Sequence, residues 1–147
     1  MAGDRTLRRL KAVENLIGIL KRHAALTSGR VFAPGTTVTL PSGDLVYPDV
    51  VYLRKPLQVT DGIQGAPDLI VQILHNSSPE GERVLKRILY EQNGVDEYWI
   101  LDAMGSCIEV FALEGAAYRA HGCFAGGATL DSPLLRGLTF PVAPIFA

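Results

Sequence analysis

Two polar side chains, Asp49 and Gln72, stand out because each lies in a short segment that is otherwise apolar. Both segments have the composition of strands, and side chains alternate across a strand, so Asp49 shares a face with Val51 and Gln72 shares a face with Ile70. If the two strands are neighbours, Asp49 and Gln72 lie close together on one side of a sheet.

Each of these residues also has a structural explanation. Asp49 follows Pro48 and could accept hydrogen bonds from nearby backbone N–H groups at the start of a strand. Gln72 could be a core amide whose polar atoms find partners within the protein. Asp68 follows Pro67 and is expected to start its strand. It would lie about 13 Å from Gln72 at ~3.3 Å per residue, too far for the two to bind one ion.

The strands expected at the centre of the fold are residues 68–74 (DLIVQIL) and 97–102 (EYWILD). Each is apolar on both faces, which is typical of a strand with layers packed above and below it. Tyr98 and Trp99 are therefore expected to pack in the core. His75, which follows the first of these strands, is expected to project to the face opposite Gln72 and to take no part in catalysis.

A helix is predicted between these two strands. Residues 77–80 (SSPE) can form its cap and first turn, and Asn93-Gly94 can supply a left-handed stop. The apolar stripe expected to face the core consists of Val84, Leu85, Ile88 and Leu89. A strand, helix, strand unit of this length suits a parallel pair of strands.

The N-terminal third predicts one helix and then short strands. From Asp4 to about Ala25 the apolar residues recur at helical spacing. The residues expected on its buried face are Leu7, Leu10, Val13, Leu16, Ile17, Leu20 and Ala24. Short strands are predicted at 31–33, 37–40, 44–46 and 49–52, with a turn at 41–44 (PSGD) and a surface loop at 55–66.

The C-terminal third predicts a hairpin and an edge strand. Residues 107–113 (CIEVFAL) and 117–124 (AYRAHGCF) flank Glu114-Gly115, and residues 138–147 could add an edge strand before their prolines stop its pairing. Cys107 and Cys123 are expected to be reduced, buried thiols, as is usual without a secretion signal.

The bulk composition is that of one globular domain. With 147 residues, 48% of them hydrophobic and 20% charged, we expect a single domain over residues 1–147. No run approaches the roughly 18 apolar residues that cross a bilayer, and the first residues lack an apolar signal core. A cytoplasmic protein without membrane contact is expected. The three histidines are scattered, so a structural zinc site is not expected.

The charges are unevenly distributed along the chain. Residues 1–30 carry seven basic and two acidic side chains, whereas the remainder carries seven basic and thirteen acidic ones. A solvated helix face explains such a cluster, but so does a helix that contacts phosphate groups. On the second interpretation, Arg8, Arg9 and Lys11 are weak candidates for nucleic-acid contacts.

Four features together resemble one protein family. They are 48–53 (PDVVYL), 67–74 (PDLIVQIL), Lys86 four residues before Tyr90, and 94–102 (GVDEYWILD). This arrangement is similar to the Uma-two family of restriction-endonuclease-like proteins within the PD-(D/E)XK nuclease superfamily. The resemblance implies an α+β fold in which a mixed sheet is flanked by an N-terminal helix and a crossover helix.

The family resemblance also implies a site and a reaction. Asp49 and the residue at position 72 would bind Mg²⁺ or Mn²⁺, and Lys86 would orient or activate the attacking water, so that the catalytic residues are Asp49, Gln72 and Lys86. Glu82 corresponds to a frequent Asp of the family and His75 to a Ser. The implied function is a divalent-metal-dependent DNA endonuclease.

The chain departs from the family pattern at position 72, where the family has Glu. Gln keeps an oxygen ligand but removes a full negative charge, so metal affinity should fall. The alternative is therefore a catalytically inactive nuclease-fold protein that serves in binding or assembly. A homodimer is also expected, in which a partner covers apolar surface of the N-terminal helix.

Overall fold

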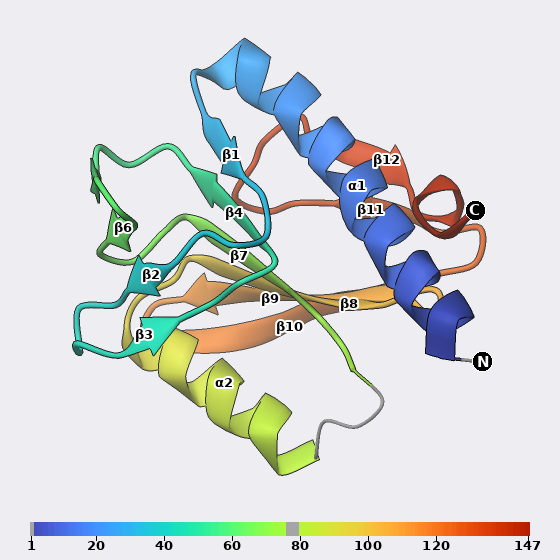
Figure 1. Cartoon of the computed structure of the whole chain (residues 1–147). Coiled ribbons are helices and arrows are strands. Elements are labelled where there is room, and N and C mark those ends of the chain that lie inside the picture. Colours follow the sequence, from blue (N-terminus) through green and yellow to red (C-terminus); the bar gives the residue numbers. More distant parts are fainter. Residues whose placement is uncertain (1, 76–79) are drawn as a thin grey trace.

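The fold is built around a six-stranded mixed sheet (Figure 1). The structure is a computed structural model that describes residues 2–75 and 80–147. The strands, in spatial order, are β1 (Arg30–Phe32), β4 (Val50–Leu53), β7 (Leu69–Ile73), β8 (Glu97–Asp102), β9 (Cys107–Glu114) and β10 (Ala117–Ala125). Strands β7 and β8 are parallel, and the other neighbours are antiparallel. The prediction that the two apolar segments form the centre of the sheet is confirmed.

The parallel pair is joined by the predicted helix, α2 (Glu80–Gln92). The predicted left-handed C-terminus of this helix is confirmed. Gly94 adopts a φ of +77°, and the N–H of Val95 donates to the carbonyl of Tyr90 at 3.1 Å. The residues predicted for its cap, 77–79, lie outside the described residues.

The predicted buried stripe of α2 is wrong for Val84, Leu85 and Ile88, whereas Leu89 is partly buried and packs against the core. Leu85 is 68% exposed and Val84 and Ile88 are also exposed, whereas Tyr90 is fully buried. The helix turns Arg83 and Lys86 towards a polar cavity beside the sheet, and this orientation leaves Val84, Leu85 and Ile88 on the outer side.

The N-terminal helix, α1 (Ala2–Thr27), is confirmed and slightly longer than predicted. Its buried face consists of Ala12, Val13, Leu16, Leu20, His23 and Ala24. Leu7 and Leu10 were predicted to be buried, but each is 57% exposed. Leu7 borders an open cavity next to the C-terminal residues instead of the core.

A small second sheet covers part of the main one. It contains β2 (Val38–Thr39), β3 (Leu45–Val46), β5 (Gln58–Val59) and β6 (Ile63–Gln64), in the order β3-β2-β6-β5. The turn at 41–44 is confirmed by the hydrogen bond from the N–H of Gly43 to the carbonyl of Leu40. The loop predicted at 55–66 is wrong in part, because β5 and β6 lie within it. Strands of two residues are too short to show a period in the sequence.

The C-terminal residues form a separate two-stranded sheet. Strand β12 (Thr139–Pro141) pairs with β11 (Thr129–Asp131) and is followed by a 3-10 helix, η1 (Ala143–Phe146). The hairpin of β9 and β10 is confirmed and carries a bulge between Ala120 and Gly122. At the free edge of β10, the N–H of Tyr118 donates to the Glu91 carboxylate of α2 at 2.6 Å.

These elements pack in three layers (Figure 1). One core lies between the main sheet and α1 with the C-terminal strands, and it includes Leu16, Trp99 and Phe140. The other core lies between the main sheet and the small sheet with α2, and it includes Tyr90 and Tyr98. The predicted α+β architecture, a mixed sheet flanked by an N-terminal helix and a crossover helix, is confirmed.

Candidate functional site

A polar cavity of about 240 Å³ lies beside α2, where β4 begins and β7 ends. It is lined by Tyr47, Asp49, Gln72, Ile73, Leu74, His75, Glu82, Arg83, Lys86, Tyr98 and Ile100. The three residues predicted as catalytic are thus brought together: Asp49 from the position just before β4, Gln72 from β7 and Lys86 from α2. We call this cavity the site pocket.

The pairing of β4 with β7 places Asp49 beside Gln72. The register pairs Val50 with Val71, so that Asp49 and Gln72 are opposite each other one residue further on. The N–H of Asp49 donates to the carbonyl of Val71 at 3.0 Å, and the N–H of Ile73 donates to Oδ2 of Asp49 at 2.7 Å. The carboxylate is therefore held at the junction of the two strands.

The environment of Asp49 shifts the pKa of its carboxyl in two opposite directions. Burial raises the pKa of its carboxyl above the ordinary value, while the hydrogen bond from Ile73 and the positive charges of His75 and Lys86 act in the opposite direction. The net direction is upward, because desolvation is the largest of these effects.

The amide of Gln72 is fixed by a buried phenol. Tyr90 donates its O–H to Oε1 of Gln72 at 2.6 Å. Burial, together with the neighbouring Tyr98, raises the pKa of Tyr90 far above its ordinary value, so the phenol stays a neutral donor. In the sequence, Tyr90 stood out only through its spacing from Lys86, because the predicted stripe of α2 turned it away from the core.

His75 was expected on the face opposite Gln72 on the condition that the strand extends to it, and this condition is not met. It lines the site pocket together with Gln72. Strand β7 ends at Ile73, so the alternation of faces no longer holds two residues later. The pocket also contains Glu82 and Arg83 of α2, of which only Glu82 was singled out from the sequence.

The weak candidates for nucleic-acid contacts lie away from the site pocket. Arg8 and Lys11 are exposed and line a different cavity together with the C-terminal residues. Arg9 has a buried Nε that finds no hydrogen-bond partner among the described residues. Among the described residues, none that lines the site pocket belongs to α1.

Asp68 has the structural role expected of a residue at the start of a strand. Its carboxylate accepts hydrogen bonds from the N–H groups of Arg54 and Lys55, at 2.6 and 3.0 Å. These two bonds hold the chain where it leaves β4.

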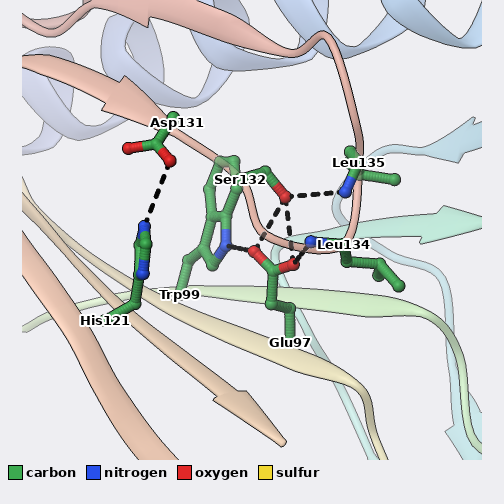
Figure 2. Close-up of polar contacts among 7 residues, drawn as sticks. All are labelled: Glu97, Trp99, His121, Asp131, Ser132, Leu134 and Leu135. Atoms are coloured by element: carbon green, nitrogen blue, oxygen red, sulfur yellow. Dashed lines mark hydrogen bonds and ion pairs between the residues drawn. The ribbon is translucent and has the colours of Figure 1, made fainter.

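Glu97 is a buried carboxylate that sequence analysis missed (Figure 2). It accepts hydrogen bonds from Nε1 of Trp99 at 2.9 Å, from the hydroxyl of Ser132, and from the N–H of Leu134 at 2.7 Å. Burial raises its pKa, and these hydrogen bonds and His121 oppose the rise. The one signal in the sequence is an acidic residue at the start of an apolar strand. Glu97 fastens the segment around Ser132 to the sheet and lies outside the site pocket.

Both cysteines are free, as expected, but they are not both buried. Cys107 is partly buried and Cys123 is exposed. Burial and the nearby Cys123 raise the pKa of Cys107 to about 11, so its thiol is protonated near neutral pH.

The comparisons with known proteins agree with this architecture. Residues 1–143 match the profile of a family, Uma2, that is described as "Putative restriction endonuclease". The chain belongs to the Uma2 family. This confirms the family identified from the sequence motifs.

A solved structure shares the Uma2 chain's fold. It is the crystal structure of a "putative nuclease belonging to DUF820" from Anabaena variabilis, with a TM-score of 0.74 and 15% sequence identity. The match covers 95% of this chain and 80% of that one. No match was found among the curated proteins. In the part of the chain that the structure describes, no helix is long and apolar enough to cross a membrane.

The donor set of this Uma2 site does not fit a metal ion held by two carboxylates. Oε1 of Gln72 is neutral and already accepts from Tyr90, and one oxygen of Asp49 already accepts from the backbone. Among the described residues no group of three His, Cys, Asp or Glu side chains could hold an ion. Asp49 is the one carboxylate that the paired strands present to the pocket, so the site is poorer in charge than the resemblance implies.

Proposed function

We propose that this protein is a nuclease-fold protein that binds DNA at the site pocket and has lost most of its hydrolytic activity. The observation that supports this proposal is the pair formed by Asp49 and Gln72. A neutral amide stands beside the carboxylate at the position where the family has Glu, and its oxygen is already bound to Tyr90.

The charges around the pair suit contact with the DNA backbone. Lys86 and Arg83 project from α2 into the same cavity, and both residue types bind phosphate groups. Asp49 and Glu82 balance these two charges, so the pocket suits a singly charged phosphodiester better than a strongly anionic ligand. DNA is the proposed ligand because the family is one of restriction-endonuclease-like proteins.

Restoring the missing charge tests the proposal. We expect the parent protein to cleave single- and double-stranded DNA hardly at all with Mg²⁺ or Mn²⁺. Gln72→Glu should bind Mn²⁺ at least about tenfold more tightly, because a unit charge about 4 Å from an ion is worth several kcal/mol at an effective dielectric constant of about 20. The rate of DNA cleavage should rise together with Mn²⁺ affinity, and adding Asp49→Ala to Gln72→Glu should abolish this increase.

The matched control is Gln64→Glu, which adds the same charge at an exposed residue of β6 outside the site pocket. It should leave Mn²⁺ affinity unchanged. If the parent protein cleaves DNA rapidly and Asp49→Ala abolishes that cleavage, the protein is an active metal-dependent endonuclease and the proposed loss of activity is wrong.

Binding of DNA is measured separately, by fluorescence anisotropy at a fixed low salt concentration. Lys86→Ala should weaken binding several-fold, whereas Lys21→Ala, at an exposed position of α1, should have less effect. If the parent and Lys86→Ala bind DNA equally well, DNA does not contact the site pocket.

A further inference from the structure

We propose that the site pocket binds a phosphodiester group without a metal ion, with the amide N–H₂ of Gln72 as a direct donor to a phosphate oxygen. This inference rests on the proposed function, and it assigns to position 72 the reverse of the role that the family gives it. A residue that would attract a cation in the family would here attract an anion.

The hydrogen bond from Tyr90 decides which end of the amide faces the pocket. Tyr90 is fully buried, and Oε1 of Gln72 is the partner found for its hydroxyl among the described residues. If the amide were turned around, the hydroxyl would accept from the N–H₂ group and its own proton would be left buried without an acceptor. Such an orphan proton costs about 1–3 kcal/mol, so the observed orientation is favoured.

The amide nitrogen is then free to bind a ligand. An amide has one acceptor oxygen and one N–H₂ group with two donors. The oxygen is occupied by Tyr90, and no hydrogen bond of Nε2 is found within the described part of the chain. Gln72 is only partly exposed, so a solvent-shielded Nε2 without a partner would count among the buried unpaired polar atoms. Nε2 is not one of these atoms. Its N–H₂ group is therefore open to the pocket that Gln72 lines.

The other donors of the pocket surround this amide. Lys86 and Arg83 line the same cavity, and His75 adds a ring nitrogen that donates in the protonated form. Asp49 and Glu82 offset the two permanent positive charges. Binding by this pocket therefore depends on directed N–H groups more than on net charge, and the expected ligand is a phosphodiester with a single negative charge.

The same geometry explains why Glu at position 72 would act differently. A carboxylate there would also accept from Tyr90, but its second oxygen would face the pocket in place of the N–H₂ group. That oxygen repels a phosphate and attracts a cation. One substitution should thus exchange the two kinds of ligand.

The test uses the parent protein in EDTA, titrated with dimethyl phosphate, the simplest phosphodiester. We expect the side-chain amide signals of Gln72 in ¹H–¹⁵N NMR spectra to shift saturably. Gln72→Glu should bind dimethyl phosphate at least tenfold more weakly, and the control Gln64→Glu should bind it like the parent. Tyr90→Phe should weaken binding several-fold, because the amide loses the bond that orients it.

Two outcomes would overturn the inference: Gln72 signals in the folded parent protein that do not respond to dimethyl phosphate, or equal binding by Gln72→Glu. The first does not depend on any variant being stable. If these results occur while DNA still binds in a Lys86-dependent manner, the inference fails and the proposed function stands. If Gln72 responds to dimethyl phosphate but DNA does not compete, the proposed function fails and the phosphate site stands.

Discussion

Gln72 and Glu97 are polar residues in the two central, parallel strands β7 and β8, yet they have different surroundings. The pairing of Asp49 with Gln72 was predictable, because strand alternation fixes which side chains share a face. The contact of Gln72 with Tyr90 was not, since it depends on how α2 is rotated about its axis. Apart from Trp99, the partners of Glu97 come from residues 132–134, and such long-range bonds leave no local pattern in the sequence.

Glu97 should make folding stability depend on pH. Burial raises the pKa of its carboxyl above the ordinary value of 4.5. Above pH 4.5 the unfolded chain releases this proton while the folded protein still holds it, so the free energy of unfolding falls as pH rises towards the raised pKa. Asp49 contributes in the same direction.

Glu97→Gln should remove the contribution of Glu97 to the fall in the free energy of unfolding with rising pH. Urea unfolding between pH 4 and pH 8 should show a shallower pH dependence for the variant than for the parent. At the acidic end the variant should be less stable by about 1 kcal/mol, because its amide N–H₂ group cannot accept from Leu134. An unchanged slope would mean that Glu97 does not titrate differently in the folded state.

Among the elements, α1 shows how a helix is fixed against a strand. At its end, the hydroxyls of Thr27 and Tyr52 are 2.7 Å apart. A Cβ atom on Gly29 would lie 2.5 Å from the hydroxyl of Tyr52, a side chain that is fully buried in β4. Glycine is therefore required at this close approach.

Gly29→Ala should destabilise the protein by about 1–3 kcal/mol, the usual effect of overpacking a core. The control lies within α1 itself: a Cβ on Gly18 would meet only Arg22, at 3.8 Å. Gly18→Ala should stabilise the protein by about 0.5–1 kcal/mol, because alanine is the better helix former. Thermal unfolding of both variants measures the difference, and equal melting temperatures would show that Tyr52 moves aside without loss.

How well the elements were predicted depended on their length. The helices and the two central strands were predictable because caps, apolar runs and spacing extend over many residues. Strands β5 and β6 were not, because each has only two residues. Strand β6 pairs with the distant β2, and β5 pairs only with β6. The exposed side of α2 was mistaken for its buried side because Leu85 and Ile88 are apolar, whereas the side that packs inward carries Arg83 and Lys86.

At the scale of the whole molecule, the homodimer expected from the sequence stays a prediction. Leu7 and Leu10 of α1 are both exposed, and they offer apolar surface to a second copy. Light scattering at high concentration should therefore give twice the monomer mass. The double variant Leu7→Ser and Leu10→Ser should shift the protein towards the monomer without lowering its melting temperature. A parent protein that stays monomeric would contradict this.

The hydrogen bond between Glu91 and Tyr118 has a consequence for how copies of the molecule can meet. A free strand edge with unpaired N–H groups is a template for another chain, and such contacts can repeat without limit. Here a carboxylate of α2 occupies one N–H at the edge of β10, and the bulge between Ala120 and Gly122 interrupts the regular spacing of the rest. Growth of the sheet into fibres is thereby opposed, and association is directed to the helical surfaces, where contacts between two copies can close on themselves.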